Sequence, residues 1–329
     1  MKVIDFHCDT LSELRHGVYR GERIDFGRNQ LHIDLQKLKK GDYLLQCFAL
    51  FINLGDPYNP LVTALEQVDL FQEFLQQYDA EMMQIKSWTD LERCRTSGKI
   101  GAMLTIEEGG CCLGNLSVLR VLYSLGVRIM TLTWNYENEL AYPNSVPGNA
   151  AKVFPCAANT ENGLKEKGFE FIQEMEKLGI LIDVSHLSDA GFWDVYHNTK
   201  KPFIASHSNA RALCGHCRNL TDEMIHAIAD RGGLTGLNYC ASFLEESESP
   251  HSTVKFMAQH AAYLRNVGGI ECIGLGSDFD GIEGNLEMYD ASCLPMLEAE
   301  LKRQKFTDDE IEKIFFGNAL RILKESLPE

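Results

Sequence analysis

Eight short apolar runs with amphipathic stretches between them constrain the fold of this 329-residue chain more than any other feature. Such an alternation is typical of parallel strands joined by helices. Eight units predict a closed (β/α)8 barrel of the TIM type, as a single domain over residues 1–329. A doubly wound open sheet is the competing architecture, but no glycine-rich phosphate turn follows the first run. The runs occupy residues 3–8, 43–51, 100–106, 127–133, 180–185, 202–206, 233–238 and 271–276.

The segments between the runs carry apolar residues at helical spacing, notably over 60–78, 116–125, 163–178, 221–230 and 253–267. Two of the expected helices begin with capping residues, Ser188-Asp189 and Thr221-Asp222-Glu223. Residues 134–162, rich in Asn, Pro and Ala, predict a long loop after the fourth strand. Residues 295–329 predict extra C-terminal helices that extend the barrel.

Charge and composition exclude some classes of partner. The formal net charge of −16 argues against nucleic acid, which requires a basic face. Asp5 interrupts any apolar signal core, and no run approaches the roughly 18 apolar residues of a membrane span. The eleven cysteines have no framework spacing, which indicates free thiols in a reducing compartment. We therefore expect a soluble, cytoplasmic protein with neither a nucleic-acid nor a membrane partner.

Polar side chains of ligand type follow five of the eight runs: His7 and Asp9, Glu107, His186, His207, and Asp278. Singly, each is explained as a helix cap or a hydrogen-bonded polar group. The carboxyl ends of all barrel strands, however, meet at one face, where barrel active sites lie. Imidazole and carboxylate groups together suit zinc or a similar divalent ion. Six groups exceed what one catalytic ion holds, so they predict two ions that share a bridging carboxylate.

At these residues the sequence resembles the membrane (renal) dipeptidase family of binuclear zinc peptidases, which are metal-dependent hydrolase barrels. The resemblance extends over nearly the whole chain and includes the 21-residue step from His186 to His207. The motifs that carry it are His7-Cys8-Asp9, Gly98-Lys99-Ile100 leading to Glu107, Leu122-Tyr123-Ser124-Leu125-Gly126-Val127-Arg128, Leu181-Ile182-Asp183-Val184-Ser185-His186, Ser206-His207-Ser208, Arg218-Asn219, and Gly276-Ser277-Asp278-Phe279-Asp280-Gly281.

The resemblance implies that His7 and Asp9 hold one zinc ion, His186 and His207 the second, and Glu107 bridges the two. Glu107 is chosen over Glu108 because both flanking motifs align to it without a gap, and neighbours at a strand end point to different sides.

The resemblance further implies that Asp278 is the catalytic carboxylate. It would handle the proton of the metal-bound water and contact the substrate amine. Arg218 would bind the free carboxylate of the substrate through its guanidinium fork. The implied reaction is hydrolysis of a dipeptide by a hydroxide that bridges two zinc ions, with a D-residue tolerated at the C-terminal position. The family is often dimeric, so a homodimer is an expectation of the same kind.

The sequence departs from the mammalian members of the family at the end of the fourth strand. They carry a histidine there, thought to stabilise the oxyanion, and this chain has Trp134. An indole N–H donates one hydrogen bond but carries no positive charge. Asn135 or Tyr136 is an alternative donor. The departure affects the expected rate and substrate more than the reaction class.

Two other functions remain open at this stage. A barrel hydrolase could act on a different amide or a modified amino acid, and such a substrate without a carboxylate would not need Arg218. A non-catalytic metal-binding relative is the second alternative. Cys214-Gly215-His216-Cys217 has the spacing of a dithiol redox motif, but it lies outside any thioredoxin-like unit, so redox function is not favoured.

Overall fold

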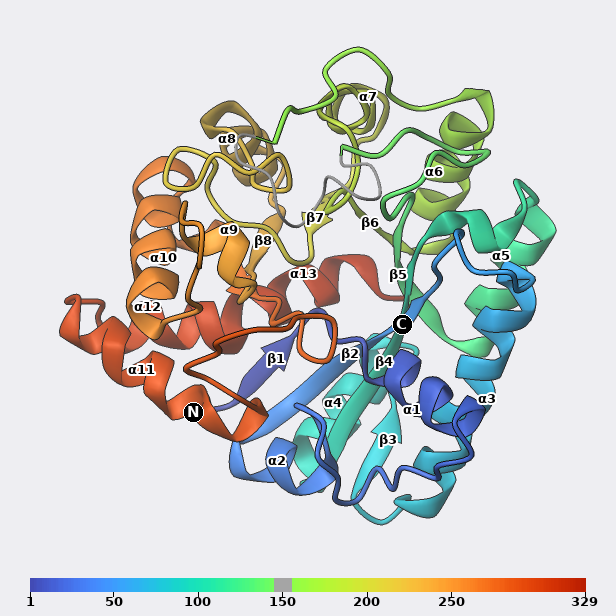
Figure 1. Cartoon of the computed structure of the whole chain (residues 1–329), viewed down its shortest axis with the longest axis horizontal. Helices are drawn as coiled ribbons and strands as arrows, with labels where there is room; N and C mark the ends of the chain where they lie inside the picture. The colour runs from blue at the N-terminus through green and yellow to red at the C-terminus, as the bar shows by residue number, and fades with distance from the viewer. Residues whose placement is uncertain (145–155) are drawn as a thin grey trace.

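A computed structural model shows a closed barrel of eight parallel strands with helices between them, and it describes residues 1–144 and 156–329 (Figure 1). Each strand pairs in parallel with the next, and the barrel closes where Asp5 pairs with Leu275. All eight strands coincide with the predicted runs, which confirms the fold class. They are β1 (Val3–Asp5), β2 (Tyr43–Phe51), β4 (Ile100–Glu107), β5 (Val127–Thr131), β6 (Leu181–Asp183), β7 (Ile204–Ala205), β8 (Leu234–Leu237) and β9 (Ile273–Leu275).

A further strand, β3 (Met82–Gln84), was not predicted. It pairs with Ile100–Ala102 at the start of β4, on the edge that β5 uses farther along the strand. Three residues are too few to show a two-residue alternation, so the sequence carries no signal for it. The strand lies outside the closed ring of eight and does not contribute to the site.

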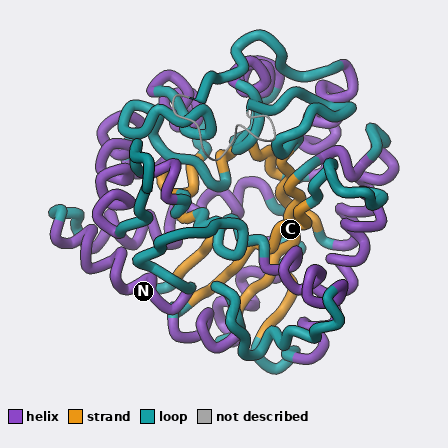
Figure 2. The backbone as a smooth tube through the Cα atoms, viewed as in Figure 1, coloured by secondary structure: helices purple, strands orange, loops and turns teal. Residues whose placement is uncertain are grey.

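Helices surround the strands on all sides (Figure 2). The predicted caps are confirmed: the Ser188 hydroxyl accepts from the Gly191 N–H at the start of α7, and Thr221 accepts from Met224 at the start of α8. The helices are α1 (Thr10–Tyr19), α2 (Leu35–Lys40), α3 (Pro60–Gln77), α4 (Trp88–Ser97), α5 (Leu116–Leu125), α6 (Glu166–Leu178), α7 (Asp189–Asn198), α8 (Asp222–Asp230), α9 (Ala241–Leu244), α10 (Val254–Gly268), α11 (Leu294–Arg303), α12 (Asp308–Glu312) and α13 (Asn318–Ser326).

The interior of the barrel is apolar at its amino-terminal end. Side chains from alternate strand positions, among them Ile4, Leu45 and Leu234, pack together with Ile322 and Leu323 of α13. The C-terminal helix α13 therefore closes this end of the barrel, and the opposite end is left for polar residues.

The long loop predicted over 134–162 falls partly on residues 145–155, which lie outside the described residues. Residues 134–144 contain turns, bends and isolated bridges. Within the described ranges, no helix has the length and apolar character that crossing a membrane requires.

The expectation of free thiols is wrong for two cysteines. Cys156 and Cys217 form a disulfide, with their Cα atoms 5.3 Å apart and a separation of 61 positions in the sequence. The strands β5 and β7 both pair with β6, so the loops that follow them lie close together, and no local spacing in the sequence signals that contact. Cys214, the other cysteine of the dithiol-like motif, is free and buried, and its thiol donates to the Ser242 carbonyl. The motif therefore does not form a pair within itself.

Candidate metal centre and active site

Six of the seven predicted site residues gather at the carboxyl end of the barrel. His7 and Asp9 follow β1, Glu107 ends β4, and His186, His207 and Asp278 follow β6, β7 and β9. The seventh residue, Arg218, lies in the loop between β7 and α8. All seven are buried or nearly so, and His7 and His207 are 2% and 1% exposed.

Glu107 lies at the centre of the group, with its two oxygens facing opposite sides. Its Oε1 is 2.8 Å from His186 Nε2 and 3.6 Å from His207 Nε2. Its Oε2 is 3.3 Å from His7 Nε2, which in turn is 3.4 Å from Asp9 Oδ2. A carboxylate with one oxygen toward each set of ligands has the arrangement of a group that bridges two cations.

The rings of His186 and His207 are oriented by their outer nitrogens. His186 Nδ1 contacts Asn135 Oδ1 at 3.1 Å, and His207 Nδ1 contacts Ser206 Oγ at 2.7 Å. Ser206 Oγ in turn donates to Asp183 Oδ2 at 2.5 Å, so both Nδ1 atoms act as donors. The two Nε2 lone pairs then face each other at 3.0 Å. Two lone pairs at that separation repel unless a cation lies between them, which is how imidazole ligands bind zinc.

On the opposite side of Glu107, two buried polar atoms have no hydrogen-bond partner within the described part of the chain. His7 Nε2 and Asp9 Oδ1 are both buried and unsatisfied, an arrangement that costs free energy in a protein interior. Ligand atoms of His7, Asp9 and Asp278 all lie within 4.8 Å of one another. Coordination of a divalent ion would satisfy these atoms, so the residues present fit a metal site.

The two sets of ligands have opposite electrostatics. Burial alone would lower the pKa of His7, but the Glu107 and Asp9 carboxylates outweigh it and hold that pKa well above its ordinary value. Burial, with the Glu107 charge, raises the pKa of Asp9 to about 6 against the influence of His7. Burial, with the positive charges of Arg218 and His7, holds the pKa of both His186 and His207 well below the ordinary value. At neutral pH the latter pair is therefore neutral and able to bind a cation.

The carboxylate of Asp278 divides its oxygens between the protein and the site. Oδ2 accepts from Asn238 Nδ2 at 2.9 Å, and Oδ1 lies 3.9 Å from His7 Nε2. Burial raises the pKa of Asp278 to about 8, and the nearby His7 opposes that rise.

The backbone around Asp278 is strained. The φ values of Asp278 and Asp280 are 63° and 68°, in the left-handed region. Gly281 is required here because a Cβ at that position would lie 2.0 Å from Asp9 Oδ2 and 2.7 Å from Asp278 Oδ1.

Arg218 is 3% exposed and incompletely hydrogen-bonded. Its Nη1 donates to the Ser185 carbonyl and lies 3.4 Å from Ser208 Oγ, while its Nε and Nη2 have no hydrogen-bond partner among the residues that the structure describes. Burial lowers the pKa of this guanidinium to about 10, and the Asp278 and Glu107 charges oppose the fall. Nε and Nη2 form one edge of the guanidinium, the edge that grips a carboxylate through two parallel hydrogen bonds. A buried, charged edge without partners indicates an anionic ligand.

Glu108 does not face the histidines. Its carboxylate accepts from the Gly110 N–H at 2.7 Å, from the Trp134 N–H at 2.9 Å and from the Asn138 side chain. Burial raises its pKa to about 7 despite these hydrogen bonds. Glu108 thus connects the loop after β4 to the loop after β5, and Glu107 alone of the two faces the site.

Trp134 lies beside the site within an aromatic group. Its ring is 4.9 Å from Phe51, 6.0 Å from Tyr136 and 6.3 Å from His186, measured between ring centroids. Asn135, one of the suggested replacements for the family histidine, has its side-chain oxygen on the His186 ring.

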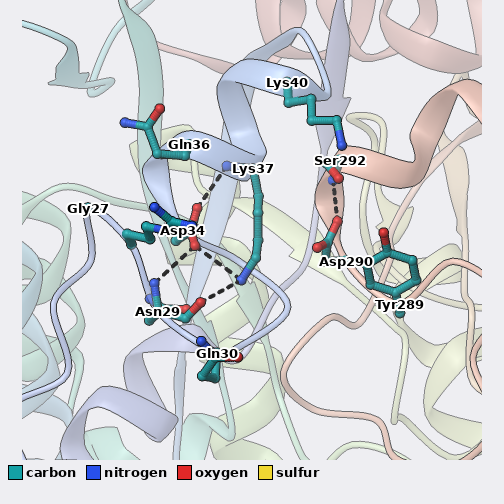
Figure 3. Close-up of a pocket in the computed structure, with 11 residues that line it drawn as sticks. Gly27, Asn29, Gln30, Asp34, Gln36, Lys37, Lys40, Tyr289, Asp290 and Ser292 are labelled. Carbon is teal, nitrogen blue, oxygen red and sulfur yellow. Dashed lines mark hydrogen bonds and ion pairs between the residues drawn. The ribbon is translucent and has the colours of Figure 1, made fainter.

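Two other features could be taken for functional sites. Cys156, His216 and Cys217 cluster within ligand distance, but the disulfide uses both sulfur atoms. A surface cavity of about 710 Å³ lies between residues 27–40 and 289–292 (Figure 3), and none of the seven predicted residues lines it. Lys37 in that cavity already pairs with Asp34 at 3.1 Å. In the described part of the chain, neither feature combines several ligand-type side chains with buried polar atoms that lack hydrogen bonds, as the carboxyl end of the barrel does.

The sequence did not identify the residues that support the ligands. Asn135, Asp183, Ser206 and Asn238 hold His186, His207 and Asp278 from neighbouring strand ends. Ser206 and Asn238, each the last residue of a predicted strand, are the two for which position alone could have given a signal.

The whole chain matches a known family. Residues 1–327 match the model of the membrane dipeptidase family, peptidase family M19. A Klebsiella pneumoniae protein, described as an uncharacterized protein in the pqqA 5′ region, is 33% identical over 82% of this chain and 97% of its own length. An uncharacterized dipeptidase of Schizosaccharomyces pombe is 32% identical over 99% of this chain and 80% of its own length.

Solved structures give the same result. Dipeptidase AC, an M19 metallopeptidase, is 26% identical and superposes with a TM-score of 0.89 over 100% of this chain and 99% of its own. A Rhodobacter sphaeroides metallopeptidase, liganded with a phosphinate mimic of the dipeptide L-Ala-D-Ala, has the same fold with a TM-score of 0.88, at 24% identity and 99% coverage of both chains. The family match over nearly every residue, together with relatives above 30% identity, shows that this chain belongs to the membrane dipeptidase family, peptidase family M19.

Proposed function

We propose that this protein is a binuclear zinc dipeptidase that cleaves dipeptides with a free C-terminal carboxylate. Its family and its dipeptidase relatives support metallo-dipeptidase activity. The observation that carries the finer proposal is the buried Nε–Nη2 edge of Arg218, which has no hydrogen-bond partner among residues 1–144 and 156–329. A substrate carboxylate would satisfy both donors and the charge at once.

His186 and His207 would hold one zinc ion, His7 and Asp9 would hold the other, and Glu107 would bridge them. The split orientation of the Glu107 oxygens and the facing Nε2 atoms of His186 and His207 support this assignment. Bound zinc ions would lower the pKa of a water molecule toward about 7 and polarise the scissile carbonyl.

Asp278 acts as the general base in this proposal. Asn238 holds its Oδ2, so its Oδ1 is directed toward the ligands and accepts the proton of the attacking water. The same carboxyl group then donates that proton to the leaving amine. A pKa raised by burial suits a group that must both accept and return a proton near neutral pH.

Arg218 fixes the other end of the substrate. A carboxylate bound at its Nε–Nη2 edge limits substrates to short peptides whose free end lies close to the scissile bond. The Rhodobacter sphaeroides metallopeptidase carries a mimic of L-Ala-D-Ala. We extend this to propose that the present enzyme accepts a D-residue at the C-terminal position.

A comparison of free dipeptides with dipeptide amides tests the carboxylate clamp. Arg218→Lys and Arg218→Ala should each lower kcat/KM for free dipeptides by about 10- to 100-fold, because a charged hydrogen bond contributes roughly 1.5–3 kcal/mol. Amides should be poor substrates of the wild type and should hardly worsen in the variants. Measuring both substrates on all three zinc-loaded proteins isolates the contact. A wild type that cleaves amides as well as free acids would favour a general amidase instead.

A further inference from the structure

A chain of three buried asparagines connects the Asp278 carboxylate to the Arg218 segment. Asn209, Asn219 and Asn238 are each at most 1% exposed, and they lie in the loops that follow β7 and β8. Buried amides are retained only where their hydrogen bonds are made, so each one fixes the groups that it contacts.

Asn238 forms the end of the chain at Asp278. Its Nδ2 donates to Asp278 Oδ2 at 2.9 Å and to the His207 carbonyl at 3.2 Å, and its Oδ1 accepts from the Cys240 N–H at 2.6 Å. Both functional groups of this amide are therefore in use, and they determine which oxygen of Asp278 is free to face the site.

Asn209 forms the middle of the chain. Its side chain makes two hydrogen bonds to the backbone of Asn238, accepting from the N–H at 3.0 Å and donating to the carbonyl at 2.9 Å. Its own N–H donates to Asn219 Oδ1 at 3.2 Å. Asn209 thus joins the loop after β8 to the loop that carries Arg218.

Asn219 forms the end of the chain beside Arg218. Its Nδ2 donates to the Cys214 carbonyl at 2.8 Å and to the Phe243 carbonyl at 2.9 Å. The side chain of Asn219, the residue that follows Arg218, is therefore held from both sides, and the centroid of the Phe243 ring lies 5.4 Å from the guanidinium carbon.

We propose that Asn238, Asn209 and Asn219 are positioning residues that fix the spacing between Asp278 and Arg218, and that this spacing restricts the enzyme to dipeptides. The inference rests on the proposed function, in which Asp278 acts at the scissile bond and Arg218 binds the terminal carboxylate. One additional residue moves a peptide carboxylate by up to roughly 3.3–3.6 Å, which a rigid spacing does not accommodate. A loosened spacing would accept the longer peptide.

The experiment compares Asn209→Ser and Asn219→Ser with Asn318→Ser in the zinc-loaded, full-length protein. Asn318 is a matched control: it is 1% exposed and donates to the Ile270 and Ile273 carbonyls at 2.7 and 2.8 Å, but it lies at the opposite end of the barrel. The measured quantities are kcat and KM for L-alanyl-L-alanine and for tri-L-alanine, with thermal unfolding recorded for each protein.

The proposal expects Asn209→Ser and Asn219→Ser to lower the ratio of dipeptide to tripeptide kcat/KM by at least about tenfold, mainly through a higher KM for the dipeptide. Asn318→Ser should lose stability and keep the wild-type ratio. If the two serine variants do not fold, Asn238→Asp gives a second test: it keeps the acceptor for Cys240 and removes the donor to Asp278, so kcat should fall with KM nearly unchanged.

An unchanged ratio in Asn209→Ser and Asn219→Ser, or an equal change in Asn318→Ser, would overturn the spacing role while leaving dipeptidase activity intact. An unchanged kcat in Asn238→Asp would do the same. A wild type that cleaves no dipeptide would instead overturn the proposed function together with this inference.

Discussion

The two sides of Glu107 differ in how they are prepared for a cation. We call His186 and His207 the nitrogen half, and His7 with Asp9 the carboxylate half. In the nitrogen half both rings are oriented by outer hydrogen bonds, and burial keeps them neutral. In the carboxylate half buried atoms are unsatisfied and the pKa of His7 is raised. The nitrogen half is thus ready for a cation at neutral pH, whereas the carboxylate half must first lose a proton.

The largest effect on kcat should come from replacing Asp278, the proposed general base, rather than a ligand of the carboxylate half. Asp278→Asn keeps the shape and the contact to Asn238 but cannot accept a proton, so kcat should fall by roughly 10²–10⁴-fold with both ions retained. Asp9→Asn should instead lose an ion. Metal analysis beside steady-state kinetics separates the two outcomes. Near-wild-type activity in Asp278→Asn would refute the role of Asp278 as general base. Loss of an ion in this variant would instead show that Asp278 is a metal ligand.

A second prediction concerns the outer support of the nitrogen half. Ser206→Ala removes the hydroxyl between His207 Nδ1 and Asp183, so the affinity for one of the two ions should fall by roughly 10- to 100-fold. Ser277→Ala is the control, because that hydroxyl donates to the His7 backbone and not to its ring. Competition with a metallochromic chelator measures both affinities. Equal losses of ion affinity in the two variants would show that the hydrogen bond to the His207 ring does not set the nitrogen half apart.

A third prediction uses pH. His7→Ala should retain only the ion of the nitrogen half, and His186→Ala only the ion of the carboxylate half. Protons compete with the metal ion for each ligand. Because the pKa of His7 is raised, protons displace the ion from the carboxylate half at a higher pH. Because the pKa of His207 is lowered, protons displace the ion from the nitrogen half only at a lower pH. Titration from pH 8 to pH 5 should therefore release the ion of His186→Ala at the higher pH. Release in the reverse order would contradict the contrast between the halves.

The smallest expected effect is at Trp134, which lies beside the nitrogen half. Trp134→His introduces a group that can carry a positive charge, at the position where the family resemblance leads us to expect histidine. If the transition state needs that charge, kcat should rise, by less than about tenfold, with little change in metal content. The measurement is kcat at pH 6 and pH 8, because only the protonated imidazole would help. A fall in kcat at both values would indicate that the packing against Phe51 matters more.

The sequence predicted the barrel and the face on which the site lies because both follow from regular patterns. Eight apolar runs determine the strands, and the ends of strands determine the site. Arg218 could be selected only through the resemblance, since neither position nor residue type separates it from ordinary polar residues. The resemblance also helped to choose Glu107 over its neighbour Glu108 at the same strand end.

What the sequence did not reveal depends on contacts between distant segments. The hydrogen bond of Asn238 to Asp278 joins residues 40 apart, and the disulfide of Cys156 and Cys217 joins residues 61 apart. Neither pair has a periodic signal. The short strand β3 was missed for a different reason, because its three residues are too few to show a two-residue alternation.

The pairing of β1 with β9 has a consequence for the order in which the nascent chain can fold. β1 begins at Val3 and β9 at Ile273, and a ribosome that adds 5–20 residues per second needs roughly 15 to 50 s to pass from one to the other. During that interval β1 can pair with β2 but not with β9, so Asp278 is absent from the group around His7 and Asp9. Completion of the proposed active site therefore coincides with closure of the barrel during translation, and an arrested, shorter nascent chain would lack Asp278.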